Sequence, residues 1–159
     1  MLFAVLTISD RCSEGLMTDT AGPAVVARLK DQWPQAEMRT ALLKDDEDAI
    51  AAALEELSAQ GAALVVTVGG TGLSPRDRTP EATRRVIDRE APGLAEAMRT
   101  KGAEQNPFAW LSRAVVGLCR STLIVNLPGS RRGAEESWVA IAALVQHGLE
   151  IVRGGQTHP

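Results

Sequence analysis

Apolar residues along this chain gather in short runs that predict buried strands. Residues 2–8 and 63–68 are almost continuously apolar, as strands covered on both faces are, and residues 37–43 form a weaker run of the same kind. Two further runs at 114–118 and 121–126 are separated by a tight turn and predict a hairpin. The sequence therefore predicts several strands, of which the last two are antiparallel.

Between these runs the apolar spacing changes to that of amphipathic helices. Ile50, Leu54 and Leu57 fall on one face of a predicted helix that Asp45 or Asp46 caps. Thr79 is expected to cap another helix, with Pro80 at its first position. The predicted helices cover 23–32, the segment from 45 or 46 to Gly61, 79–89, part of 91–105 and a last segment that Ser130 caps.

Strands that alternate with helices imply an α/β fold with three layers. We expect a mostly parallel sheet with one antiparallel hairpin strand and helices on both faces, in one domain spanning residues 1–159. Ligands of such sheets bind beyond the carboxyl ends of the strands. Three polar loops follow strand ends, at 9–11, 69–77 and 126–130. We expect these loops to form one site.

Composition removes several classes of function. The net charge of -3 argues against a nucleic-acid partner, and no apolar run is long enough to cross a membrane. The cysteines, Cys12 and Cys119, lie far apart, and the histidines are His147 and His158, so a cysteine-built zinc site and a Ser-His-Asp triad are poorly supplied. The first ten residues resemble a strand rather than an export signal, so we expect a cytoplasmic protein with reduced thiols.

The segment VTVGGTGLSPRDRTPEAT, which begins at Val66, carries the strongest functional signal. Gly69-Gly70-Thr71-Gly72 follows a strand and offers free amides to a phosphate, although a tight turn explains the glycines equally well. Asp77 stands between two arginines ahead of a helix, where its carboxylate can hold Mg²⁺ against nucleotide phosphates or form a surface ion pair. The pattern favours a Mg²⁺-dependent enzyme that acts on a nucleotide or a phosphate.

Two charged clusters allow both a functional and a structural interpretation. The acids at 45–48 suit the positive end of a helix dipole, and one of them can also contact a metal or a substrate. Arg131 and Arg132 oppose the dipole of the last helix, so either a bound anion or a solvated basic pair explains them.

Several segments together resemble the MogA/MoaB family of molybdenum-cofactor biosynthesis. They are GGTGLSPRDRTPEAT, ISDRCSEG, DTAGP, LSRAVVG and NLPGS, and the similarity extends to the G domains of a plant cofactor-synthesis protein and of gephyrin. The resemblance implies a molybdopterin adenylyltransferase. It transfers AMP from ATP to the terminal phosphate of molybdopterin, uses Mg²⁺ and releases pyrophosphate. It further implies a homotrimer that contacts a molybdenum-inserting enzyme.

The resemblance also assigns roles to individual positions. Asp77 and Asp46 match the catalytic and metal-binding acids, but the proline that normally precedes the second acid is Asp45 here, so the functional acid is either Asp45 or Asp46. Ala21 replaces a family serine. The implied nucleotide contacts are Gly69, Gly70, Thr71, Gly72, Asn126, Pro128 and Gly129, and the implied substrate contacts are Ser9, Asp10, Arg11, Ser112, Arg113 and Ser130, of which Ser112 and Arg113 match an element near the pterin side.

Three alternatives remain open from the sequence. A MoaB-type protein or a scaffold domain binds molybdopterin with little or no transfer. The competence-damage family has a similar fold and acts on nicotinamide or ADP-ribose compounds, but it carries a different glycine loop and a longer chain.

Overall fold

The computed structural model describes residues 1–154 and contains a single mixed sheet of six strands. In spatial order these are β2 (Glu37–Leu43), β1 (Leu2–Ile8), β3 (Leu64–Val68), β6 (Thr122–Leu127), β5 (Val116–Cys119) and β4 (Arg89–Glu90). The first four are parallel, and β5 and β4 are antiparallel additions at one edge. The predicted α/β architecture with a hairpin strand is confirmed.

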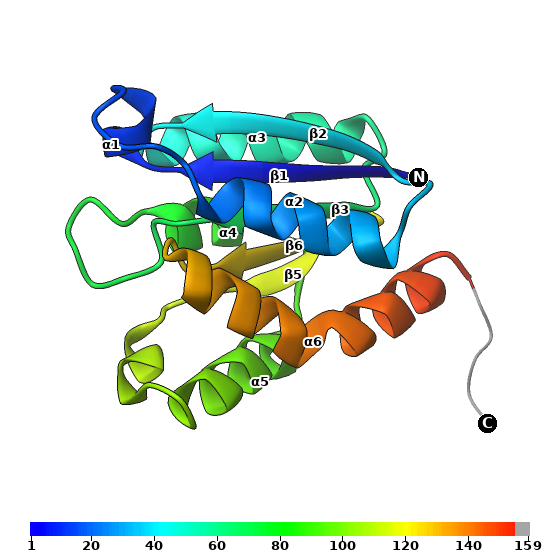
Figure 1. Ribbon diagram of the computed structural model, residues 1–159. Helices are drawn as coiled ribbons and strands as arrows, with labels where there is room; N and C mark the ends of the chain where they lie inside the picture. Colours follow the sequence, from blue (N-terminus) through cyan, green and yellow to red (C-terminus); the bar gives the residue numbers. More distant parts are fainter. Residues whose placement is uncertain (155–159) are drawn as a thin grey trace.

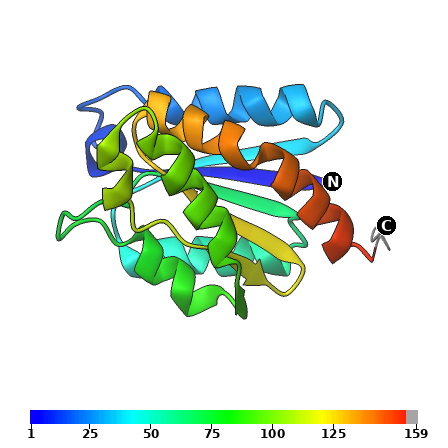
Figure 2. The same ribbon diagram turned by 90° about the horizontal axis from the view of Figure 1, so that it is seen from below.

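Helices cover both faces of the sheet and complete three layers (Figures 1 and 2). The helices are α1 (Asp10–Ser13), α2 (Ala21–Gln32), α3 (Glu47–Ala59), α4 (Thr79–Val86), α5 (Pro92–Ala103), the 3₁₀ helix η1 (Pro107–Leu111) and α6 (Arg131–Val152). Helices α2, α5 and α6 lie on one face of the sheet, and α3 and α4 lie on the other.

Strand β1 shows why its sequence is continuously apolar. Successive side chains of a strand point to opposite faces, so Phe3 and Val5 pack under α2 and α6 while Leu6 and Ile8 pack under α3 and α4. Each of these four side chains is buried. A strand with both faces covered favours apolar residues at nearly every position, here all except Thr7, which is why the period-2 pattern is missing.

The topology brings the three polar loops to one edge of the sheet. Strands β1, β3 and β6 are parallel neighbours, with Thr7 paired to Val68 and Val68 paired to Leu127. The Gly69 amide then donates to the Leu127 carbonyl oxygen at 3.0 Å. The loops that follow the three strands are therefore held side by side at the strand ends, as the sequence predicted.

The helix starts differ from the predictions in one respect that bears on the site. Arg78, not Thr79, is the N-cap of α4, and it makes no side-chain cap hydrogen bond. The Thr79 hydroxyl instead donates to the Gly69 carbonyl oxygen at 2.9 Å, so this hydroxyl is committed to the glycine loop. The capping prediction for Thr79 was wrong because a tertiary contact replaced the local one.

Other differences are short elements with little periodicity. The sequence predicted neither α1 nor η1, whose caps are Ser9 and Asn106, nor the two-residue strand β4.

The segment at 91–105 forms one twelve-residue helix, because Pro92 occupies its first position and Gly102 falls near its end. Residues 1–154 include no helix long and apolar enough to cross a bilayer, and His158 lies outside them.

Candidate functional site

The glycine loop, residues 69–77, follows β3 and begins in a conformation that a side chain would block. Gly69 has φ 110° and Gly70 has φ 64°, both in the left-handed region that favours glycine. A Cβ at Gly69 would collide with the Ile8 carbonyl oxygen, and one at Gly70 would collide with the Thr79 hydroxyl. The glycines are therefore required by close packing against β1 and α4.

Amides from two loops lie along the rim of the site without a protein acceptor. Within residues 1–154 the N–H groups of Gly70, Thr71 and Gly72 donate no hydrogen bond to another protein group, and neither do those of Gly129 and Ser130. The two loops touch, since a Cβ on Gly129 would lie 3.2 Å from the Gly69 Cα. Unpaired amides grouped in this way suit an anionic ligand.

Two cavities meet at this rim. The first has a volume of about 370 Å³ and lies between the glycine loop, α5, η1 and the start of α6. The second has a volume of about 420 Å³ and lies between the glycine loop and the segment that joins β1 to α2. Both are lined by Gly70, Asp77, Gly129 and Ser130. The site thus offers two compartments with one shared boundary.

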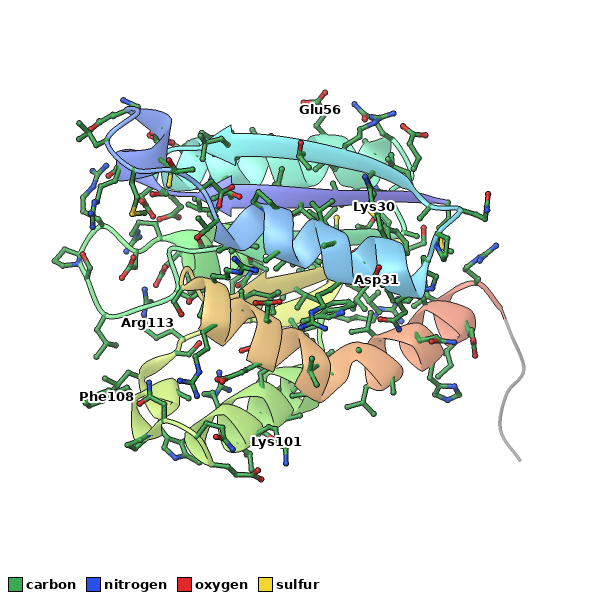
Figure 3. All side chains as sticks on the ribbon, in the orientation of Figure 1. Lys30, Asp31, Glu56, Lys101, Phe108 and Arg113 are labelled. Carbon is green, nitrogen blue, oxygen red and sulfur yellow. The ribbon has the colours of Figure 1, made fainter. Side chains whose placement is uncertain are left out.

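The two compartments differ in chemistry. Met98, Phe108 and Leu111 line the first cavity, and Phe108 is 73% exposed. Figure 3 labels Phe108. The second cavity is lined largely by hydroxyl and charged groups, including Ser9 and Arg11. The first compartment suits a flat ring system, whereas the second suits a polar and charged group.

The adjacent acids Asp45 and Asp46 point to different places. Asp46 is exposed and caps α3, accepting from the Ala49 amide at 2.8 Å. Asp45 lines the second cavity, and its Oδ2 accepts from the Asp10 amide at 3.1 Å. Geometry therefore favours Asp45 over Asp46 as the acid of the site, because the Asp46 carboxylate is occupied by its own helix.

The environment of Asp45 works against its ionised form. Burial is the main cause that raises the pKa of Asp45, and the negative charges of Asp10 and Asp77 act in the same direction. Its Oδ1 is buried and has no hydrogen-bond partner among residues 1–154. A cation bound beside Asp45 would therefore stabilise the ionised form of its carboxylate.

The carboxylate oxygens of this site fit a divalent cation that binds together with a substrate phosphate. In the part of the chain that the structure describes, no three His, Cys, Asp or Glu side chains gather to enclose a metal ion. Mg²⁺ needs fewer, since one or two carboxylates together with substrate phosphates and water complete its shell. The unpartnered Asp45 Oδ1 and the Asp77 carboxylate are the oxygens that fit this role.

Asp77 sits at the shared boundary of the two cavities. Its Oδ2 accepts from the Ser74 amide at 3.0 Å, which fixes the carboxylate across the loop. A Cβ on Gly72 would come within 2.8 Å of the same oxygen, so glycine at position 72 is what allows Asp77 this close. The structure therefore brings the predicted acid and the predicted glycine loop together.

Asp10 lies beside the site, and its groups are engaged with neighbouring protein groups. It pairs with Arg76 at 2.6 Å, and its Oδ1 accepts from the Asp45 amide at 3.0 Å. The hydrogen bond from Arg76 is the main reason that the pKa of Asp10 lies below its ordinary value. Asp10 thus ties Asp45 and the glycine loop to the end of β1, while its neighbours Ser9 and Arg11 line the second cavity.

The final predicted loop splits into lining and structural residues. Pro128 lines the first cavity, and Ser130 lines both while its hydroxyl caps α6 by accepting from Gly133 at 3.2 Å. Asn126 is fully buried, and its amide group donates to the hydroxyls of Thr67 and Thr83 at 2.9 Å each. Direct nucleotide contact by Asn126 disagrees with this burial, because its side chain is hydrogen-bonded to β3, α4 and Val115, the residue before β5.

Replacing Asn126 by alanine should therefore reduce stability rather than nucleotide affinity. The change removes the acceptor for the Val115 amide, now bonded at 3.1 Å, and the donors to two buried hydroxyls. We expect a loss of about 2–4 kcal/mol in the free energy of unfolding, measured by urea denaturation. Weaker ATP binding with an unchanged unfolding midpoint would restore Asn126 as a contact residue.

The neighbouring residues Ser112 and Arg113 also point to different places. Ser112 lines the first cavity. Arg113 lines neither of the two cavities, because its guanidinium turns toward the base of the glycine loop and donates to the Gly72 carbonyl oxygen at 2.7 Å. The predicted molybdopterin contact at Arg113 therefore disagrees with the orientation of its side chain.

Some lining residues escaped the sequence analysis. Asp19 lines the second cavity, accepts from the Thr7 hydroxyl at 2.6 Å and accepts from the Gly22 amide at 2.9 Å. Its place just ahead of a helix start was the available signal. Phe108 comes from η1, which has no periodic pattern. Arg131 is a different case, because the sequence had already marked it as either an anion contact or a solvated basic residue; it lines the second cavity and pairs with Glu135 one helical turn later, at 3.4 Å.

Comparison with known proteins gives a consistent result. The model of a family described as a probable molybdopterin binding domain matches residues 4–147. The molybdopterin adenylyltransferase of Haemophilus influenzae is 39% identical over 135 residues, which are 84% of this chain and 68% of that protein. The molybdopterin biosynthesis enzyme MoaB of Thermus thermophilus is 43% identical, with a TM-score of 0.89 and 96% of each chain covered.

Other relatives are much longer. The molybdenum cofactor synthesis protein cinnamon of Drosophila melanogaster is 34% identical over 151 residues, which are 94% of this chain and 25% of that protein. This chain spans less than half the length of the first curated relatives that it matches. The resemblance to the MogA/MoaB family is confirmed.

Proposed function

This chain belongs to the family of probable molybdopterin binding domains, and on that premise we propose that it is a molybdopterin adenylyltransferase of molybdenum-cofactor biosynthesis. It transfers AMP from ATP to the terminal phosphate of molybdopterin and releases pyrophosphate. The observation that carries the proposal is the pair of cavities with one shared boundary at Gly70, Asp77, Gly129 and Ser130. A transfer between two bound substrates needs two adjacent compartments, so that the reacting groups of the substrates meet at their boundary.

Each compartment suits one substrate. The first cavity, with Phe108 and Leu111, takes the flat pterin, and the second, with Asp45 and Arg11, takes ATP. The molybdopterin phosphate and the α-phosphate of ATP then meet at the shared boundary. In this arrangement Ser112 lies on the pterin side, whereas Ser9 and Arg11 lie on the nucleotide side.

The chemistry requires little proton transfer. The attacking phosphate is already anionic, so the protein has to position the groups and to stabilise charge on the α-phosphate. The unpaired amides of Gly70, Thr71 and Gly72 donate to phosphate oxygens. Asp45 and Asp77 would hold Mg²⁺, which supplies charge neutralisation to the phosphates when bound. Such a reaction needs no histidine as a general base, which suits a chain with only two histidines.

The direct test is turnover. Purified protein incubated with ATP, Mg²⁺ and molybdopterin should form adenylylated molybdopterin and pyrophosphate in equal amounts. Omission of molybdopterin should suppress pyrophosphate, since ATP alone lacks the acceptor phosphate. A protein that retains molybdopterin and forms no pyrophosphate would instead be a binder or a scaffold domain.

The same proposal includes a homotrimer that delivers its product to a molybdenum-inserting enzyme. Sedimentation equilibrium should then give three times the 16.9 kDa mass of one chain. A mass equal to one chain would contradict the trimer and leave the reaction untouched.

A further inference from the structure

Arg113 is placed where three segments of the chain meet. It follows η1 and precedes β5, and Figure 3 shows it beside the loop that follows β3. Its Nε donates to the Gly72 carbonyl oxygen at 2.7 Å, and its Nη2 donates to the Asp77 carbonyl oxygen at 2.7 Å. Its main-chain amide donates to the Thr71 carbonyl oxygen at 2.9 Å. One residue thus joins Thr71 and Gly72 in the glycine loop to Asp77 at its end.

The remaining side of the guanidinium binds Glu81 of α4. Arg113 Nη1 donates to Glu81 Oε1, and both side chains are about one-quarter to one-third exposed. Burial by itself raises the pKa of Glu81, but the hydrogen bond from Arg113 and its positive charge outweigh burial and leave this pKa below its ordinary value. Glu81 is therefore ionised at neutral pH and holds the guanidinium in one orientation.

Helix α4 anchors the first half of the same loop. The Thr79 hydroxyl donates to the Gly69 carbonyl oxygen at 2.9 Å, and the Thr79 amide donates to the Gly70 carbonyl oxygen at 3.1 Å. Thr79 and Arg113 together therefore engage every carbonyl oxygen from Gly69 to Gly72.

Anchoring these carbonyl oxygens decides where the amides point. In a trans peptide the carbonyl oxygen of one residue and the N–H of the next point in opposite directions. Thr79 holds the oxygens of Gly69 and Gly70, and the main-chain amide of Arg113 holds that of Thr71, so the amides of Gly70, Thr71 and Gly72 point away from that side. The Arg113 guanidinium adds bonds to the next oxygen, that of Gly72, and to that of Asp77, and so fixes the segment that carries these amides. These are the same amides that lack a protein acceptor and line the rim of the cavities.

We propose that Arg113, paired with Glu81, is a positioning residue that presets the amides of the glycine loop for phosphate and does not itself contact substrate. A loop held in advance loses less conformational entropy when phosphate binds. The inference rests on the proposed function for the identity of the phosphate, whereas the order of the loop is a property of the free protein. The two can therefore fail separately.

The test compares Arg113→Gln, Glu81→Gln and the double variant. In the free protein, amide hydrogen exchange at Ser74, Asp77 and Thr79 reports the order of the loop, since each of these amides is hydrogen-bonded within it. Each single variant should exchange at least about ten-fold faster at these amides. The double variant should exchange no faster than Arg113→Gln, because the pair acts as one unit.

Arg85→Gln is the matched control. Arg85 is also on α4 and pairs with Glu47 and Asp48 at the surface, away from the glycine loop. It should leave exchange at the three amides unchanged. If Arg113→Gln does not fold, Arg113→Lys replaces it, because one ammonium group keeps the charge but cannot reach all three acceptors. Wild-type exchange in folded Arg113→Lys would overturn the proposal.

Affinity for ATP separates positioning from direct contact. If Arg113 positions the loop, both single variants should raise the dissociation constant of ATP by similar factors. If Arg113 binds a substrate phosphate, Glu81→Gln should leave this affinity unchanged or improve it by freeing the guanidinium, with exchange unaltered. That second pattern would overturn the inference, whereas normal loop effects without any AMP transfer would contradict only the proposed function.

Discussion

Asp77→Asn should abolish adenylyl transfer in a protein that remains folded. Asp77 is at the boundary of both cavities, and its negative charge is close enough to raise the pKa of Asp45. An asparagine oxygen still accepts from the Ser74 amide, so the loop keeps its present fixation. What is lost is one of the two carboxylates that fit the cation of the nucleotide.

We expect the rate of pyrophosphate release to fall by at least about 100-fold, the usual scale for removing one electrostatic partner of a transition state. Asp48→Asn is the matched control, because Asp48 is exposed and its contact is a surface pair with Arg85 at 2.7 Å. Activity within about two-fold of the unchanged protein in Asp77→Asn would remove this residue from the site.

The second large effect separates two neighbouring acids. Asp45→Asn should lose transfer by a similar factor, because Asp45 lines the second cavity with an unpartnered carboxylate oxygen. Asp46→Asn should change little, since Asp46 caps α3 and asparagine caps a helix about as well as aspartate. A loss of transfer in Asp46→Asn alone would reverse this assignment.

Stability should move in the direction opposite to activity at Asp45. Burial raises its pKa in the folded protein, so the unfolded state releases this proton more readily, and ionisation of Asp45 opposes folding as the pH rises. Asp45→Asn should therefore increase the melting temperature at pH 7. The increase should shrink as the pH falls through the raised pKa toward the ordinary value of 3.8 and below it.

The stability measurement has its own control. Asp46→Ala removes the cap of α3 and should cost about 1 kcal/mol of unfolding free energy without loss of transfer. A lower melting temperature for Asp45→Asn at pH 7 would show that the carboxylate is paired in solution. The account of an unsatisfied acid would then be contradicted.

The sequence predicted the layers well because positions that are buried in the fold are occupied by apolar residues, and their spacing shows which elements are covered. Strands β1 and β3 are covered on both faces, and their apolar runs, each broken by one buried threonine, follow from that. The convergence of the three polar loops was predictable for a related reason. Parallel strands end at one edge, so three polar loops that are distant in sequence had to converge there.

Side-chain direction was what the sequence did not determine. Asn126 and Arg113 occupy positions beside the site, but burial of the first and the pairing of the second with Glu81 turn both away from the cavities. Asp45 and Asp46 differ by one position, and the helix that begins after them decides which carboxylate becomes a cap. These outcomes depend on contacts between segments that no local pattern encodes.

The glycine loop and the loop after β6 should together bind the phosphates of ATP where the two cavities meet. Backbone amide NMR with Mg²⁺ and the unreactive analogue α,β-methylene ATP tests it most directly. We predict that the largest shift changes fall on Gly70, Thr71, Gly72, Gly129 and Ser130. Unchanged signals there, with shifts instead in the groove lined by Arg28 and Lys101, would contradict it.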